Sequence, residues 1–392
     1  PMYPNVGRII GYRDSGKKRP YIMCEYAHAQ GNSNGNFKDL WDIIYDSPNL
    51  QGGFIWDFMD QGFKMKTEGR EYWMYNGKMG SYKWLEDKKE ELNTGTDGII
   101  SANGIPKPQA YEVKKVYQYI QFEGKDLSKG IVLVRNRYDF TNLNEYDFVW
   151  EIIRNGTQII TGDFSIDLEP HKEKDLRLNF PAIPEDGNEY FLNLYAYTKK
   201  GTDLVPLHHE VAKEQIPLNQ GSFFASLPVC SGNLSYEITE DVLSFKSGAV
   251  AGKIDLKKGI LYDYAINGKK PIKQYPEPAF WRAPVDNDFG NKMPLLAGVW
   301  RTAHANRYVK KVTLEEKNVK GLLIRVDWIL SDIQVPYTME YLICDNGSVV
   351  VTGSIDLTGT RLPELPRFGM RMELEQLYDN LSYYGRGPSE NY

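Results

Sequence analysis

The 392-residue chain carries 47 Lys and Arg against 52 Asp and Glu, a formal net charge of −5 at pH 7. This mildly acidic balance, without a basic block, argues against nucleic acid or an anionic membrane as a partner. No apolar run reaches the roughly 18 residues that a membrane span requires. Apolar residues make up 41% of the chain, so two or three domains with sizeable cores are expected.

The first 120 residues alternate between strand and helix patterns. RPYIMCEY at 19–26 and LQGGFIWDF at 50–58 predict two buried strands. Apolar residues at helical spacing predict a helix over 35–46, and a second helix begins near Pro108. This alternation indicates parallel strands, in an open sheet or in an α/β barrel.

From about residue 121 the pattern changes to the period-two alternation of antiparallel strands. Asn155-Gly156 and Asn346-Gly347 lie between alternating runs and predict hairpin turns, and Asn267-Gly268 is a third turn signal. We predict a β-sandwich at 121–219 and a larger antiparallel sheet domain from about 222 to the end.

Metal clusters are not predicted from the sequence. Cys24, Cys230 and Cys344 are odd in number and far apart, which fits neither a disulfide framework nor a metal cluster. DNDFG at 286–290 departs from the EF-hand calcium pattern, because Gly290 stands where an acidic or amide residue is needed.

Polar side chains follow the first predicted strand directly. Glu25 would emerge at the carboxyl end of that strand, which is the end that carries the chemistry in α/β barrels. It is a candidate nucleophile, base or metal ligand, or else a residue that caps the turn. His28 is a candidate for orienting a ligand hydroxyl, or a loop residue bonded to backbone. Trp56, at the end of the second strand, is either a stacking platform for a sugar or part of the core.

The number of strands is too small for a complete barrel. An eight-fold barrel takes roughly 250 residues, and residues 1–120 provide only two strand–helix units. The first domain is therefore a small open sheet, or the last part of a barrel whose earlier strands precede Pro1. The start at Pro1, without an initiator Met, favours the second interpretation.

Five stretches, in order, resemble the long-chain β-galactosidases of glycoside hydrolase family 2. They are RPYIMCEYAHAQGNS, LQGGFIWDFMDQG, GIPKPQAYEVKKVYQ, FWRAPVDNDFG and YYGRGPSENY. The first three resemble the nucleophile segment, the next barrel strand and the last barrel helix, and the other two resemble signatures of the C-terminal β-sandwich. The resemblance implies the last part of a TIM (β/α)8 barrel at 1–120, an immunoglobulin-like β-sandwich at 121–219 and a large, C-terminally truncated β-sandwich at 222–392.

The resemblance also implies roles for single residues. Glu25 matches the catalytic nucleophile, and Tyr3 matches a tyrosine beside it, whose hydrogen bond favours the ionised carboxylate. His28 matches a residue that contacts the galactosyl 6-hydroxyl, and Trp56 lines the same pocket. Asp97 stands where some members have an asparagine that binds the sugar and a sodium ion, so it is a candidate substrate and monovalent-cation ligand.

The second catalytic carboxyl group has no match in this chain. Retaining glycosidases use two carboxyl groups about 5 Å apart, and in the family the acid/base lies in an Asn-Glu pair on an earlier barrel strand. Asn-Glu occurs here at 144–145 and 188–189, outside the barrel segment. The acid/base and the Mg²⁺ ligands are therefore expected upstream of Pro1. Lys78 departs from an acidic residue common in the family, and Gly290 matches a glycine that opens a mobile loop.

The resemblance implies retaining hydrolysis of terminal non-reducing β-D-galactosides by a full-length homo-oligomer that uses Mg²⁺ and Na⁺, with β-galactoside oligosaccharides as substrates. The isolated chain is expected to be inactive. One alternative is a family 2 hydrolase of another sugar, a β-glucuronide or β-fucoside. Another is a non-catalytic carbohydrate-binding or structural remnant. The compartment, cytoplasm or periplasm, stays open.

Overall fold

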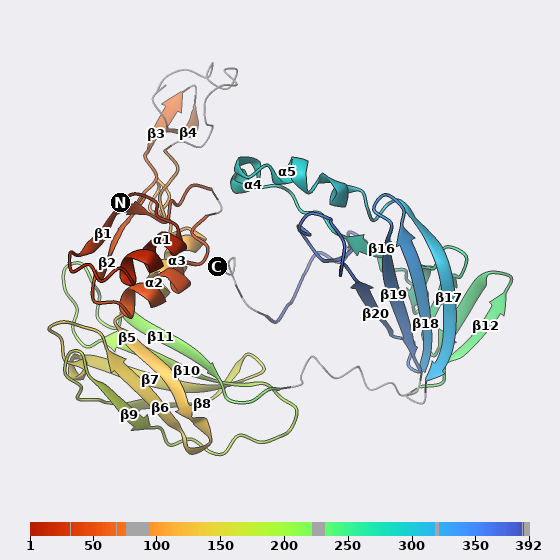
Figure 1. Ribbon diagram of the computed structural model, residues 1–392. Coiled ribbons are helices and arrows are strands. Elements are labelled where there is room, and N and C mark those ends of the chain that lie inside the picture. Colours follow the sequence, from red (N-terminus) through yellow and green to blue (C-terminus); the bar gives the residue numbers. More distant parts are fainter. Residues whose placement is uncertain are drawn as a thin grey trace. The chain divides into compact units, whose positions relative to one another are not determined.

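The computed structural model describes residues 1–31, 33–67, 69–75, 95–221, 232–317, 321–385 and 387. Lys78, Cys230 and the SENY end of the chain lie outside these residues. The chain divides into two compact units, Pro1–Phe223 together with Tyr384–Tyr392, and Phe224–Tyr383 (Figure 1). The predicted domain boundaries near 120 and 220 stay predictions.

The N-terminal part of the first unit is built on two parallel strands, β1 (Tyr21–Tyr26) and β2 (Leu50–Ile55), as predicted. Helix α2 (Phe37–Tyr45) connects them. Apolar residues of both strands, of α2, and of helices α1 (Val6–Arg13) and α3 (Pro108–Val116) share one buried core. Gly53 allows the strands to lie close together, because a Cβ there would lie 2.6 Å from the Met23 Cβ atom.

Two elements of this part are not among the predicted ones. Helix α1 begins after Asn5, whose side chain accepts a hydrogen bond from the Arg8 amide at 2.8 Å. An antiparallel hairpin of β3 (Gly62–Thr67) and β4 (Arg70–Tyr75) occupies part of the segment between the second predicted strand and Pro108, for which no element was predicted.

The rest of the first unit consists of two antiparallel sheets that enclose one core. The four-stranded sheet has the order β11-β10-β7-β8, and the three-stranded sheet has the order β5-β6-β9. Their bounds are β5 Ile120–Asp126, β6 Ile131–Asn136, β7 Tyr146–Arg154, β8 Thr157–Phe164, β9 Glu173–Arg177, β10 Tyr190–Thr198 and β11 Glu210–Pro217, with 3-10 turns at Leu127–Lys129 and Leu143–Glu145. The predicted hairpin at Asn155-Gly156 is confirmed, and it joins β7 to β8.

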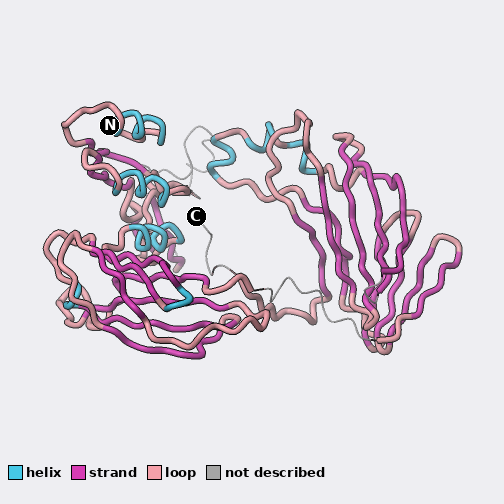
Figure 2. Tube along the Cα trace, turned by 60° about the horizontal axis from the view of Figure 1, so that its bottom comes forward, coloured by secondary structure: helices cyan, strands magenta, loops and turns pink. Residues whose placement is uncertain are grey.

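The described residues of the second unit form three sheets, of orders β12-β13-β14-β15, β17-β18-β19-β20 and β16-β21. Its short helices lie at one end of the long strands (Figure 2). The bounds are β12 Ser235–Thr239, β13 Val242–Ser247, β14 Val250–Asp255, β15 Ile260–Ile266, β16 Ile272–Ala279, α4 Asp286–Gly290, α5 Met293–Leu296, a 3-10 turn Gly298–Arg301, β17 Arg307–Lys317, β18 Gly321–Leu330, β19 Val335–Cys344, β20 Val349–Ile355 and β21 Gly369–Leu374. Buried Trp300, Trp328 and Tyr337 belong to its core.

The other two Asn-Gly signals behave differently from each other. Asn346-Gly347 joins β19 to β20, which is the predicted hairpin. Asn267-Gly268 also forms a turn, but the next strand, β16, pairs with β21 and not with β15. A turn signal fixes a local reversal, whereas strand pairing depends on the tertiary fold.

The prediction about the cysteines is wrong for Cys344, which is buried and disulfide-bonded, whereas Cys24 is free. The wide spacing of the cysteines along the chain gave no indication that one of them forms a disulfide bond in the folded protein. No helix in the described part of the chain has both the length and the apolar composition to cross a membrane.

Candidate active site

The chain start and the end of β1 lie together. The Tyr3 amide donates to the Glu25 carbonyl at 2.9 Å, and the Cys24 amide donates to the Pro1 carbonyl at 2.9 Å. Met2 forms a parallel bridge with Glu25. These backbone bonds place Tyr3 beside Glu25 at the carboxyl end of β1, although 21 residues separate them in the sequence.

The Tyr3 hydroxyl is hydrogen-bonded to the Glu25 carboxylate. The pKa of Tyr3 is raised, first by partial burial, then by this bond, and then by the negative charges of Glu25, Asp97 and Asp57. Tyr3 therefore stays protonated at neutral pH and acts as a donor. Three carboxylates converge electrostatically on this hydroxyl.

His28 and Asp97 form the second pair at this site. His28 Nε2 lies 3.2 Å from Asp97 Oδ1, and the Asp97 side chain is only 10% exposed. That oxygen has no partner with hydrogen-bond geometry among the described residues, so the two atoms lie close together without a hydrogen bond between them. The His28 ring also lies 5.6 Å from the Tyr3 ring, centre to centre. Tyr3, Glu25, His28 and Asp97 thus form one constellation.

Three hydrogen bonds among the described residues hold the loop that carries His28. The Ala29 amide donates to the Trp56 carbonyl at 2.7 Å. The Ser33 hydroxyl donates to the His28 carbonyl at 2.5 Å. Buried Gln109, on α3, donates from Nε2 to the Gly31 carbonyl at 2.8 Å. Sequence reasoning did not single out Gln109, because its role depends on a contact 78 residues away in the chain.

Trp56 follows β2, and its backbone joins the same region. Its amide donates to the Tyr26 carbonyl at 3.2 Å. Trp56 is 38% exposed, so it does not belong to the core. The Asp57 amide donates to the Asp97 carbonyl at 2.6 Å, and the Ile99 amide donates to the Asp57 carbonyl at 2.9 Å. This pairing explains how Asp97 comes to lie near the ends of β1 and β2. Asp57 was missed from the sequence, although it directly follows Trp56 at the end of the strand.

The site provides a carboxylate with a phenolic donor, and an imidazole next to a second carboxylate. Within the described ranges no group of three or more His, Cys, Asp or Glu side chains is placed to hold a metal ion. The buried Asp97 Oδ1 is the one feature here that fits a monovalent cation, but His28 stands beside it. A single carboxylate oxygen is not a complete ligand set.

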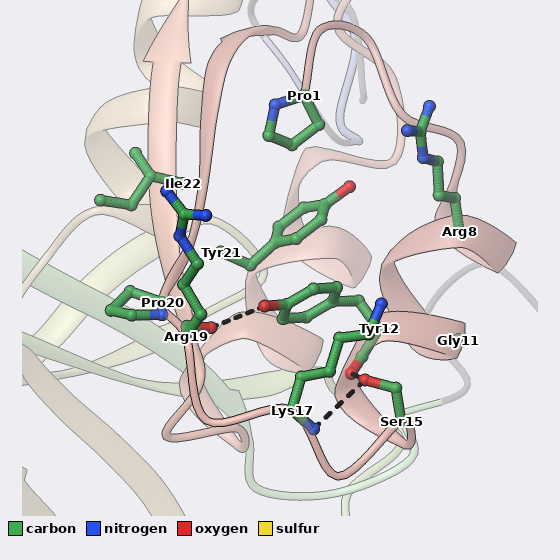
Figure 3. A pocket seen from close by; sticks show the side chains of 10 residues that line it. All are labelled: Pro1, Arg8, Gly11, Tyr12, Ser15, Lys17, Arg19, Pro20, Tyr21 and Ile22. Atoms are coloured by element: carbon green, nitrogen blue, oxygen red, sulfur yellow. Dashed lines mark hydrogen bonds between the residues drawn. The ribbon is translucent and has the colours of Figure 1, made fainter.

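A cavity of about 860 Å³ lies between α1 and the start of β1 (Figure 3). Its lining includes Arg8, Tyr12, Lys17 and Arg19, and the Tyr12 hydroxyl donates to the Arg19 carbonyl at 2.7 Å. None of the lining residues carries a carboxylate side chain, and none belongs to the constellation around Glu25. The cavity lining therefore lacks the carboxyl groups that retaining glycosidases use.

Three family models match the chain in order. Residues 5–122 match the TIM barrel domain of glycosyl hydrolases family 2, residues 132–219 match β-galactosidase domain 4, and residues 246–392 match the β-galactosidase small chain. The matched barrel segment contains Glu25, His28, Trp56 and Asp97.

Curated relatives match along 96% to 100% of the chain. The β-galactosidase of Priestia megaterium is 33% identical over 100% of this chain and 37% of its own length. Those of Halalkalibacterium halodurans and Psychromonas ingrahamii are 31% and 29% identical, over 38% and 37% of their own lengths. An exo-chitosanase structure from Amycolatopsis orientalis aligns with 68% of this chain and 32% of its own at 9% identity, with a TM-score of 0.21, too low to support an argument. This chain spans little more than a third of these curated relatives, and it belongs to the β-galactosidases of glycosyl hydrolase family 2.

Proposed function

We propose that the protein takes part in the hydrolysis of terminal, non-reducing β-D-galactosides with retention of configuration, and that Glu25 is the nucleophile. The observation that carries this proposal is the position of Tyr3 beside Glu25 at the carboxyl end of β1, where the Tyr3 amide donates to the Glu25 carbonyl at 2.9 Å. A hydroxyl donor favours the ionised carboxylate that must attack the anomeric carbon. The order of matched domains and the names of the relatives support galactosides as the substrate class.

In this mechanism the Glu25 carboxylate displaces the aglycone and forms a glycosyl-enzyme, which water then hydrolyses. His28 and Asp97 bind hydroxyl groups of the galactosyl unit, and the exposed Trp56 ring packs against the sugar's C–H face. Tyr3 remains a hydrogen-bond donor to Glu25 throughout. Asp97 as a sodium ligand, and Mg²⁺ in the complete enzyme, belong to the same proposal.

The acid/base is proposed to come from chain outside these 392 residues. Glu145 lies in the 3-10 turn Leu143–Glu145, and Glu189 precedes β10 and accepts a hydrogen bond from Tyr384 at 2.7 Å. Both therefore adjoin the two antiparallel sheets of the first unit and lie outside the part built on β1 and β2, which holds Glu25. The greater length of the relatives supports an additional segment. A complete TIM barrel, an immunoglobulin-like middle domain, a large β-sandwich and a homo-oligomer belong to the same proposal.

The test is Glu25→Gln in the full-length enzyme, with Glu112→Gln on α3 as a matched control. Glu25→Gln should abolish turnover of aryl β-galactosides with little change in melting temperature, and a 2-fluoro-galactosyl inactivator should label Glu25. Glu112→Gln should retain turnover. Labelling of another carboxylate, or near-wild-type activity of Glu25→Gln, would refute the assignment. Faster turnover of an aryl β-glucuronide or β-fucoside would replace the substrate class.

A further inference from the structure

A second polar cleft, of about 500 Å³, lies in the first unit and contains none of the candidate active-site residues. Side chains from the end of α2, the junction before β5, the end of β6 and the segment before β9 line it. They include Tyr45, Tyr119, Arg137, His171 and Lys172. This volume falls within the roughly 300–1,000 Å³ of small-molecule sites.

Backbone hydrogen bonds fix the walls of this cleft. The Arg137 amide donates to the Tyr119 carbonyl at 2.8 Å, and the Asn136 amide donates to the Lys172 carbonyl at 2.9 Å. The Asn136 side chain is only 2% exposed, donates to the carbonyls of Thr141 and Leu168, and accepts from the Tyr138 amide. The cleft is therefore organised before any ligand arrives, which reduces the entropic cost of binding.

Aromatic rings form one wall. Tyr119 is 47% exposed and stacks on Tyr138 with ring centres 4.8 Å apart, and Tyr138 stacks on Tyr146 at 5.6 Å. The Arg137 guanidinium lies 3.9 Å from the centre of the Tyr45 ring. Stacking holds the planar donor of Arg137 in place. An exposed tyrosine with a fixed arginine nearby suits a ligand that has both an apolar face and an anionic group.

Some of the charged side chains that line the cleft lie next to an opposite charge, and others do not. Arg135 lies between Glu123, at 2.6 Å, and Glu173, at 3.0 Å, so its charge is already compensated. His171 lies 3.0 Å from Asp139. Arg137 and Lys172 also line the cleft, and across the described ranges neither forms an ion pair with a carboxylate. These two cations are available to an anion.

We propose that this cleft binds an acidic saccharide, with its ring on Tyr119 and its carboxylate or sulfate group at Arg137 and Lys172. That the ligand is a saccharide rests on the proposed function, whereas the anion-binding site itself does not. Nucleic acid fits less well, because the net charge of the chain is −5. A single anionic group matches the two available cations. Binding here is separate from turnover and would hold an acidic glycan to the enzyme.

The test is calorimetric titration of the 392-residue chain at low salt with digalacturonate, galactose 6-sulfate, lactose and sodium sulfate. An acidic sugar should bind at least about tenfold more tightly than lactose, and rising salt should weaken it. The better acidic sugar identifies carboxylate or sulfate as the group recognised. Equal binding of lactose would overturn the proposal, as would sulfate ion binding as tightly as galactose 6-sulfate.

Matched variants place the binding in the cleft. Arg137→Gln and Lys172→Gln should each weaken binding of the acidic sugar about tenfold, which is the usual effect of losing a charge-assisted hydrogen bond. Lys172→Gln provides the same test if Arg137→Gln fails to fold. Arg177→Gln removes the same charge at the far end of β9 and should leave binding unchanged. An equal loss in Arg177→Gln would mean general charge attraction and would refute the site. Since no turnover is measured, failure of the proposed hydrolysis would not affect this result.

Discussion

Gly53→Ala should push apart the two strands that carry the candidate active site. The added Cβ would lie 2.6 Å from the Met23 Cβ and from its carbonyl oxygen, whereas ordinary contact begins at 3.4 Å, so the strands must separate by up to 0.8 Å. Overpacking of this kind costs up to about 3 kcal/mol. Glycine within a strand is itself destabilising relative to alanine, so its replacement offsets up to about 1 kcal/mol of that cost. We therefore expect a net loss of about 2 kcal/mol in the free energy of unfolding.

The matched control is Gly11→Ala in α1, where a Cβ would meet nothing within 4 Å. Because alanine is the better helix former by about 1 kcal/mol, this variant should be slightly more stable than wild type. Calorimetry should show the transition of the first unit lowered by about 6 °C in Gly53→Ala and raised by about 3 °C in Gly11→Ala. Hydrogen exchange at β1 should quicken only in Gly53→Ala. A Gly53→Ala protein within about 0.5 kcal/mol of wild type would refute the close-approach argument.

Three further outcomes follow from other contacts. Arg282 lowers the pKa of buried Asp288 in the folded state. This pair therefore stabilises the fold at pH values above about 3.9, the pKa of the group in the unfolded chain. The contribution is lost as pH falls through the lower pKa of the folded state. Asp288→Asn should therefore cost about 2 kcal/mol in urea unfolding at pH 7 and clearly less near pH 2, and an equal cost at both would contradict this. The Tyr26 hydroxyl accepts a hydrogen bond from Trp41 Nε1 and shares another with the Tyr117 hydroxyl. Tyr117→Phe should therefore cost about 1 kcal/mol in the free energy of unfolding, and Tyr26→Phe should cost more. The reverse order in urea unfolding would count against this. Amides of β18, paired on both sides, should exchange at least about tenfold more slowly than those of β1, and equal protection would show that the two-stranded sheet is more stable than its pairing suggests.

Secondary structure could be predicted wherever apolar periodicity coincided with burial. The strands β1 and β2 and the helices α2 and α3 were found in this way. Helix α1 was missed because Ile9 is its only buried residue, so its sequence shows little periodic signal. The β3–β4 hairpin was missed because β3 is almost fully exposed, which removes the alternation that marks a half-buried strand.

The candidate site was predicted unevenly for a similar reason. Glu25, His28 and Trp56 end predicted strands or follow them closely, so position alone made them candidates. Tyr3 could be interpreted only through the family resemblance, because its place depends on backbone pairing with β1. Asp57 and Gln109 act through residues 40 and 78 positions away, and no local pattern reports such contacts.

The three Asn-Gly turns that follow residue 121 will deamidate at different rates. In such pairs the glycine amide nitrogen attacks the asparagine side-chain carbonyl and ammonia leaves, and water then hydrolyses the succinimide to aspartate or isoaspartate. Asn155 is restrained at both ends of its amide, by Asn188 at 2.7 Å and by the Glu189 amide at 2.9 Å, and Asn346 accepts from Ser348 at 2.7 and 3.0 Å. Exposed Asn267 has no side-chain hydrogen bond within the described part of the chain, so among these three turns deamidation on storage should begin there and add a negative charge after β15.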